Sequence, residues 1–214
     1  MRNSSKAKAS ARTKGLTLVE LLVAISILGF VAVLGWRGLD SIVRARIALS
    51  SDLEQTRGMQ LAFAQLQNDC EHLASPAHLP NKIPLAIEQG KLTLVRTVFA
   101  DNQPTRLQVI SYRITNGMLT RRESLTTRDL RELDTLWQIA ISDTDTNPPV
   151  MLQSEVTSMA MRIWINGGWN AGTGTPAPPV GSTATQPAPG GLEVTMQLRG
   201  RDTGVLKIFL LGAV

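Results

Sequence analysis

The chain has few of the residues from which catalytic and metal centres are built. It contains one cysteine, Cys70, and two histidines, His72 and His78, among 214 residues. A single cysteine excludes an intramolecular disulfide and any zinc or iron–sulfur site made of several cysteines. Two histidines leave little material for a histidine-built metal centre. Because no phosphate-binding loop, nucleophile motif or recognisable carboxylate pair is present either, the sequence predicts no catalytic residue, no cofactor and no enzyme.

The excess of positive charge is confined to a short segment at the N-terminus. The net charge is +5, but residues 1–15 hold five of the 22 basic side chains and none of the 17 acidic ones. Residues 16–214 therefore carry equal numbers of both signs. A neutral body has no excess of cations with which to neutralise phosphates, so the sequence predicts no nucleic-acid partner.

One long apolar segment follows the basic tail. Residues 16–36 contain a single charged side chain, Glu20. A helix of this length matches the hydrocarbon core of a membrane, because each residue adds about 1.5 Å. The basic residues before it predict that the N-terminus stays in the cytoplasm and that the remainder crosses the membrane. A plain signal anchor has this length too, whereas a cleaved secretory signal peptide is shorter and ends at small residues.

Glu20 is the feature that a plain anchor leaves unexplained. A carboxylate in a membrane helix is costly and needs a positively charged partner. If the chain were cut after Gly15, it would begin at Leu16 with a free α-amino group, and Glu20 would be its fifth residue. In an assembly of such helices, the amino group of one subunit could lie beside the Glu20 carboxylate of its neighbour and neutralise it.

The segment from Lys14 to Ile25, KGLTLVELLVAI, resembles the class III prepilin signal of type IV pilins and type II secretion pseudopilins. In that family, a prepilin peptidase cuts after the glycine and methylates the new amino terminus. The resemblance implies cleavage after Gly15 with Lys14 in the recognised segment, N-methylation of Leu16, and a role in assembly for Glu20. The family usually has phenylalanine as its first mature residue, so Leu16 is a mild departure.

Apolar spacing continues beyond the membrane segment. Steps of three and four residues predict an amphipathic helix with one face on a globular domain, so that residues 16 to about 74 form one long helix. Ser75-Pro76 would end it. Cys70 falls on the stripe and is expected to be a buried, inert thiol, since His72 points in another direction. The stripe consists of Leu39, Ile42, Val43, Leu49, Leu53, Met59, Phe63, Leu66, Cys70 and Leu73.

The remainder of the chain has the alternating pattern of β-strands. Asn116-Gly117 between two alternating runs predicts a tight hairpin. A helix followed by an antiparallel sheet is an α+β arrangement, which is how the pilin fold is built. The final residues 206–214 are too few to span a bilayer and are expected to be a buried strand. The expected strands are 92–99, 107–114, 118–122, 136–141, 156–165, 192–198 and 205–211.

Three further features have a structural and a functional interpretation. Asp143, Asp145 and Asn147 are similar to the start of a calcium loop, but the required glycine and distal glutamate are missing, so we predict a polar turn and leave calcium unsupported. Residues 167–191 hold seven glycines and five prolines, which predicts a flexible surface loop. The tryptophans could form a binding platform, but we predict core anchors, with Trp169 the least expected to be buried. These tryptophans are Trp137, Trp164 and Trp169.

Taken together, the segments at 36–41 (WRGLDS), 61–70 (LAFAQLQNDC) and 112–123 (YRITNGMLTRRE) resemble the J-type minor pseudopilins of the type II secretion system. The resemblance implies a cleaved leader (1–15), a transmembrane half-helix (16–36), a periplasmic half-helix (37–74) and a β-rich domain (75–214). It implies a single-pass inner-membrane protein in the tip complex that initiates and caps the pseudopilus. The implied partners are the I-type and K-type minor pseudopilins, other pseudopilins, the prepilin peptidase and the inner-membrane assembly platform.

Two other functions share part of this pattern. A minor pilin of a type IV pilus, serving adhesion, motility or DNA uptake, has the same N-terminal signal. Such pilins often carry a C-terminal disulfide loop, which one cysteine cannot form. A membrane-anchored periplasmic enzyme or binding protein would keep its N-terminus uncut and would not need Glu20.

Overall fold

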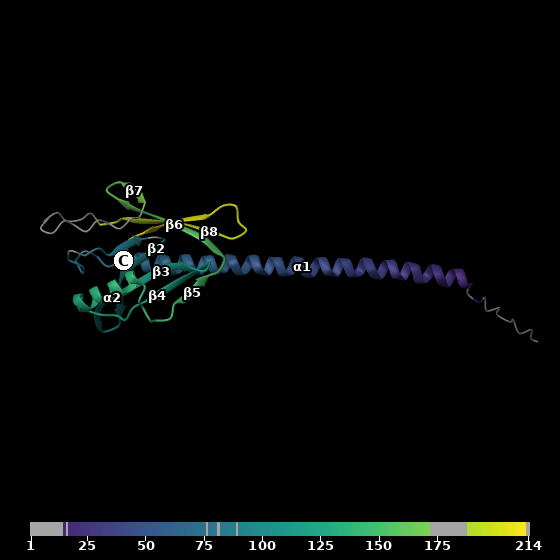
Figure 1. The fold of residues 1–214 in the computed structure, drawn as a ribbon, viewed down its shortest axis with the longest axis horizontal. Helices are drawn as coiled ribbons and strands as arrows, with labels where there is room; N and C mark the ends of the chain where they lie inside the picture. Colours follow the sequence, from purple (N-terminus) through teal and green to yellow (C-terminus); the bar gives the residue numbers. More distant parts are fainter. Residues whose placement is uncertain are drawn as a thin grey trace, which may run out of the picture. The chain divides into compact units, whose positions relative to one another are not determined.

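A computed structural model describes residues 15, 17–75, 77–80, 82–88, 90–171 and 188–212. The chain divides into two compact units, Met1–Asp52 and Leu53–Val214. A long helix precedes antiparallel strands, as Figure 1 shows, which confirms the predicted α+β, pilin-like architecture. The elements are α1 (Leu18–Glu71), β1 (Leu85–Glu88), β2 (Lys91–Ala100), β3 (Gln103–Thr115), β4 (Met118–Glu123), α2 (Leu130–Ser142), β5 (Val150–Gln153), β6 (Val156–Ile165), β7 (Gly168–Ala171), β8 (Gly191–Leu198) and β9 (Val205–Leu210).

Helix α1 ends three residues earlier than the sequence predicts. Its last residue is Glu71, not a residue near 74, because the chain leaves the helix to pair with β2. Leu73 forms an isolated antiparallel bridge with Arg96, and the Ala74 N–H donates to the Val95 carbonyl at 2.9 Å. Pro76, which was expected to stop the helix, lies outside the described residues.

The predicted apolar stripe of α1 is buried only in its last part. Met59, Phe63 and Cys70 are buried, whereas Leu39 and Leu49 remain 56% and 61% exposed. A helix buries a face only where other elements cover it, and the sheets of the second unit cover α1 from Met59 onward. The expectation that the stripe packs on the globular domain from Leu39 was therefore wrong for its first half.

Two antiparallel sheets make up most of the second unit. One has the order β1-β2-β3-β4-β5 and the other β7-β6-β8-β9. Most expected strands are confirmed as β2, β3, β4, β6, β8 and β9, while β1, β5 and β7 were not foreseen. Between β3 and β4, Asn116 and Gly117 both have positive φ angles, 51° and 75°, as a two-residue hairpin with a type I′ turn requires.

Residues 136–141 are not a strand but part of α2. The N-cap residue of α2 is Asp129, whose side chain accepts a hydrogen bond from the Arg131 N–H at 2.8 Å. Leu133 and Ala140 are its buried residues, seven positions apart on one face. The six-residue window had looked like a strand because it is too short to show the 3.6-residue period.

The core has two parts, on opposite faces of the larger sheet. Strand β2 is buried on both sides: Leu94 belongs to the main core with α1 and both sheets, whereas Val95 packs in a second cluster with α2. The second cluster also contains Leu107, Val109 and Leu133. Helix α2 therefore covers the face of this sheet that α1 leaves open.

The C-terminal strand differs from its prediction. Leu206, Ile208 and Leu210 of β9 are each more than half exposed, and Phe209 is its buried residue. The prediction of a buried strand was wrong because β9 is an edge strand with only one face on the core. Within the predicted loop 167–191, residues 168–171 form β7 instead, pairing with β6, and residues 172–187 lie outside the described residues.

Candidate functional site

The N-terminal end of α1 holds Glu20 in a hydrogen-bonded turn. The backbone N–H and the hydroxyl of Thr17 both donate to the Glu20 carboxylate at 2.9 Å. In return, the Glu20 N–H donates to the Thr17 hydroxyl at 3.3 Å. This reciprocal pair is a capping box, which satisfies N–H groups that a helix start leaves without partners. Its Thr-x-x-Glu signature is readable in the sequence, and our sequence analysis missed it.

The capping box gives Glu20 a role within its own helix. The two groups that donate hydrogen bonds to the Glu20 carboxylate, both from Thr17, are neutral. Within the described part of the chain, the carboxylate therefore has no cationic partner. The side chain is exposed and accessible to another molecule. Gly15 is also exposed, and Lys14 and Leu16 lie outside the described residues.

Apart from Glu20, the first part of α1, residues 18–36, is apolar on every side. Leu18, Phe30 and Trp36 are 80%, 72% and 74% exposed. A helix that is apolar all round needs lipid or protein around it. By length and composition, α1 could span a membrane.

A second carboxylate on α1, Asp69, is fully buried at the other end of the helix. Arg121 donates to it twice, from Nε to Oδ2 at 2.8 Å and from Nη2 to Oδ1 at 3.1 Å. Arg96 donates from Nη1 to Oδ1 at 2.8 Å, and the Tyr112 hydroxyl donates to Oδ2 at 2.5 Å. Asp69 thus joins α1 to β2, β3 and β4 through charge-assisted hydrogen bonds.

Neighbouring groups complete this network. The side-chain Oε1 of Gln108 accepts from Arg96 Nε at 3.0 Å, and Gln108 Nε2 donates to the backbone carbonyl of Ser124 at 2.8 Å. Arg121 Nη1 donates to Glu123 at 2.8 Å. Among the described residues, no buried side-chain nitrogen or oxygen is left without a partner. A fully satisfied network of this kind holds one arrangement of helix and sheet.

Two members of the network, Tyr112 and Arg121, have pKa values raised by their surroundings. Burial raises the pKa of the Tyr112 hydroxyl, and the Asp69 charge raises it further, so the group stays a donor. Burial alone would lower the pKa of Arg121, but its hydrogen bond and ion pair with Asp69 outweigh burial and raise it. These groups do not exchange protons near neutral pH, which suits a structural role rather than acid–base catalysis.

Cys70 and the two histidines form no nucleophilic pair. Cys70 is completely buried, and burial raises the pKa of its thiol, which confirms the inert thiol predicted from the sequence. The His72 ring lies against Phe99, with ring centroids 6.3 Å apart, and its Nδ1 is 2.8 Å from the Asn68 carbonyl oxygen. His78 contacts Ser75 at 3.1 Å.

The segment that begins at Asp143 is the polar turn expected from the sequence. Asp143 ends α2 in the left-handed conformation, with φ 63°, and its carboxylate forms ion pairs with Lys91, Arg113 and Arg122. The Asp145 side chain accepts from the Asn147 N–H at 2.8 Å instead of pointing into a shared site. Within the described ranges, no three metal-binding side chains converge.

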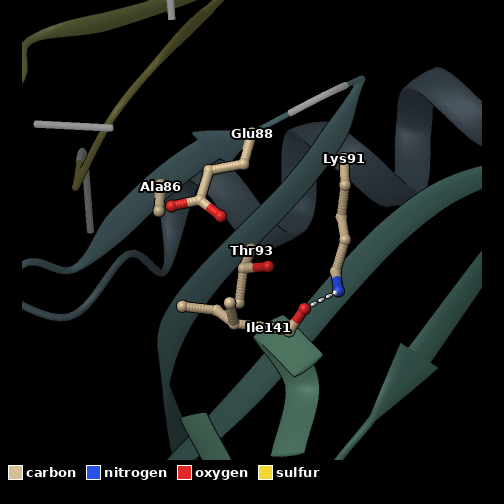
Figure 2. Close-up of a pocket in the computed structure, with 5 residues that line it drawn as sticks. All are labelled: Ala86, Glu88, Lys91, Thr93 and Ile141. Carbon is tan, nitrogen blue, oxygen red and sulfur yellow. Dashed lines mark hydrogen bonds between the residues drawn. The ribbon is translucent and has the colours of Figure 1, made fainter. Parts of the chain in front are cut away.

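Lys91 closes a small pocket beside this turn, shown in Figure 2. Its Nζ donates to the Ile141 carbonyl at 2.8 Å, at the C-terminal end of α2. Burial lowers the pKa of Lys91, and nearby Arg113 lowers it further. The pocket volume of about 10 Å³ is room for about one water molecule, so it is not a ligand site. The lining residues are Ala86, Glu88, Lys91, Thr93 and Ile141.

The tryptophans are less buried than predicted. Trp137 packs half-buried against the α2 cluster, but Trp164 is 39% exposed, so its prediction as a core anchor was wrong. On β6 the core-facing positions alternate with outward ones, and Trp164 falls on the outward face. There it meets Trp169 edge to face, with ring centroids 5.3 Å apart.

Comparison with known protein families gives two matches. Residues 37–209 match the family of the type II secretion system (T2SS) protein J, and residues 10–36 match the prokaryotic N-terminal methylation motif. No curated protein matches the chain. The first match covers more than half of the chain and favours a secretion pseudopilin over a type IV pilin. The methylation motif and the apolar helix together identify a membrane-anchored, prepilin-like protein.

Proposed function

The chain belongs to the T2SS protein J family and is a minor pseudopilin of the type II secretion system, and on this premise we propose that it is part of the tip complex that initiates and caps the pseudopilus. Proteins of this family associate with other pseudopilins and act as structural subunits. The observation that carries the proposal is the family match across residues 37–209. We assign the chain no catalytic step, metal or cofactor.

The proposed partners are the I-type and K-type minor pseudopilins, with the exposed side of α1 within residues 37–73 as the contact surface. Most side chains of this stretch are exposed in the isolated chain, which leaves them available to neighbours. The test is to express the full-length chain with both partners in membranes and to purify it through a tag. We expect one complex that contains all three proteins. Recovery of the chain alone, with all three present in the membrane, would contradict the proposal.

Cleavage after Gly15 and N-methylation of Leu16 are the proposed maturation steps. The methylation motif at residues 10–36 supports them, as does the exposure of Gly15 before the first turn of α1. Gly15→Asp should leave the full-length precursor in the membrane, which electrophoresis and mass spectrometry of the N-terminus detect. A mature chain that still begins at Leu16 would show that this glycine is not what the peptidase requires. Ser4→Asp, the introduction of the same side chain at a leader position outside the recognised segment, is the matched control and should be processed.

The orientation follows from the same steps. We propose that the N-terminus faces the cytoplasm before cleavage, that α1 anchors the protein in the inner membrane, and that the β-rich domain is periplasmic. The basic residues at 1–15 support this orientation. Protease added to cells with a permeabilised outer membrane should digest the domain, and protection of the domain would contradict the orientation.

Glu20 is proposed to neutralise the amino terminus of an adjoining subunit. Two substitutions separate this role from the capping box. Glu20→Gln removes the charge and keeps an oxygen that can cap the helix, whereas Thr17→Ala removes the cap and keeps the charge. We expect Glu20→Gln to be processed and inserted normally but recovered about tenfold less in the complex, and Thr17→Ala to assemble nearly as well as the wild type. The reverse order would assign Glu20 to helix capping alone.

A further inference from the structure

Strand β9 is an open edge of the smaller sheet. In the described part of the chain it pairs with β8 and with no other strand. Its outward side chains Leu206, Ile208 and Leu210 are 54%, 52% and 69% exposed. The one charged residue of β9, Lys207, faces inward, where its Nζ donates to Gln67 at 3.1 Å. The exposed face of β9 is therefore entirely apolar.

The free edge of β9 also presents backbone N–H and C=O groups. The Leu211 N–H donates to the Gly190 carbonyl on the β8 side. Because successive residues of a strand direct their N–H and C=O groups to opposite sides, those of Leu206, Ile208 and Leu210 point away from β8. An extended chain is the structure that pairs with such a row of donors and acceptors.

The other sheet edges offer less to a partner strand. Strands β1, β5 and β7 have four residues each, against six in β9. β1 ends in the exposed acidic residue Glu88, and the pairing of β5 is interrupted by a register shift. Short strands, charges and bulges are how proteins protect their sheet edges from other chains. β9 has no charge on its outward face, and the one protection of this kind that it carries, the inward-facing Lys207, is engaged by Gln67 of α1.

The outward face next to β9 has the composition of a protein interface. Ile208 lies opposite Glu193, which lies opposite Arg162, and Arg162 Nε donates to Glu193 at 2.6 Å. Leu210 lies opposite Gly191, which lies opposite Trp164. Aromatic residues and arginine are enriched at the centres of interfaces, where they carry much of the binding energy.

We propose that β9 receives a β-strand from an adjoining pseudopilin subunit, which extends the sheet β7-β6-β8-β9. This inference rests on the proposed function. β9 runs beside the last part of α1, since Arg201 before it contacts Thr56 and Lys207 contacts Gln67. The edge is thus continuous with the helix surface proposed for partners. The added strand must present uncharged side chains beside Leu206 and Leu210, because a charge there would lose water without gaining a counter-charge from the residues directly opposite, Thr195 and Gly191.

The first test places a charge on the edge. Full-length chains with Leu206→Lys or Leu210→Lys are expressed with the I-type and K-type pseudopilins and purified through a tag. We expect about a tenfold or greater loss of co-purified partner, because the residues directly opposite these positions, Thr195 and Gly191, offer a buried lysine no counter-charge. The matched control is Met151→Lys, the same change at an exposed position of the β5 edge, which should assemble as the wild type. Unaltered recovery of partners with both β9 variants would overturn the inference.

The second test identifies what lies on the edge. Ile208→Cys gives one accessible thiol, since Cys70 is buried. A short cysteine-to-amine cross-linker, applied to membranes that contain the assembled complex, should join residue 208 to another pseudopilin, as mass spectrometry would show. A cross-link to a second copy of this chain, or none above the level of Leu125→Cys, would overturn the inference. If the wild type binds no pseudopilin at all, the proposed function fails, whereas normal binding by the β9 variants defeats only this inference.

Discussion

Glu20 and Asp69 are two carboxylates on one helix with opposite surroundings. Asp69 is fully buried, and two arginines and a tyrosine of the same chain satisfy it. Glu20 is exposed, and in the described part of the chain its donors are the neutral groups of Thr17. A charge that is satisfied inside the chain serves folding. A charge that lies in an apolar segment without a counter-charge is suited to assembly.

The largest expected effect comes from removing the buried carboxylate. Asp69→Ala would leave Arg121 as a buried cation and Arg96 as a partly buried one, both without their shared partner. We expect the free energy of unfolding to fall by about 3–5 kcal/mol, the usual cost of breaking a buried ion pair. Denaturant unfolding of the full-length chain in detergent, followed by pulse proteolysis, measures this. The control is Glu155→Ala, which removes an ion pair with Arg199 at the surface and should change stability by less than about 1 kcal/mol. A small effect at Asp69 would mean that the network does not hold helix and sheet together.

A smaller effect sharpens the description of the network. Tyr112→Phe removes one donor to Asp69 and leaves both arginines in place. A hydrogen bond to a charged group contributes about 2 kcal/mol, so the loss of stability should be clearly less than for Asp69→Ala. The same unfolding assay compares the two variants. If Tyr112→Phe destabilised the protein as much as Asp69→Ala, the hydroxyl and not the ion pairs would be the main connection.

The variants at Asp69 and Tyr112 test the role of the buried carboxylate in folding, and Glu20→Gln tests the role of the exposed carboxylate in assembly. The changes at Asp69 and Tyr112 should act on the unfolding of the second unit, Leu53–Val214, and reduce assembly only as far as they reduce the amount of folded protein. Glu20→Gln lies in the first unit and should leave that unfolding unchanged. If Asp69→Ala lowers the free energy of unfolding but the protein still folds in normal amount, we expect it to form the complex with its partners.

Features carried by short-range patterns were predictable from the sequence. The Asn116-Gly117 hairpin and the apolar helix follow from local residue types and are confirmed. Asp69 was missed although it continues the spacing of the buried stripe after Leu66, because a charged residue there was not considered part of the core. Its partners come from strands that are distant in the sequence, and no local pattern indicates Arg96 or Arg121.

The wrong predictions arose where a local pattern could not show what the rest of the fold covers or how long an element is. Residues 136–141 were assigned to a strand because a short apolar window hides the helical period of α2. The burial of β9 and Trp164 was overestimated because an apolar residue was assumed to face the core, whereas both strands alternate between a core face and an exposed face. Position at a sheet edge is a property of the whole fold and is not encoded in the strand itself.

The most direct test of the account measures assembly and unfolding on the same sample of Glu20→Gln. The full-length variant and the wild type are each expressed with the I-type and K-type pseudopilins, and the recovered complex and the unfolding of the β-rich domain are compared. The account predicts about a tenfold loss of complex with an unchanged unfolding midpoint. Equal recovery of the complex from both proteins would contradict the assignment of the Glu20 charge to assembly.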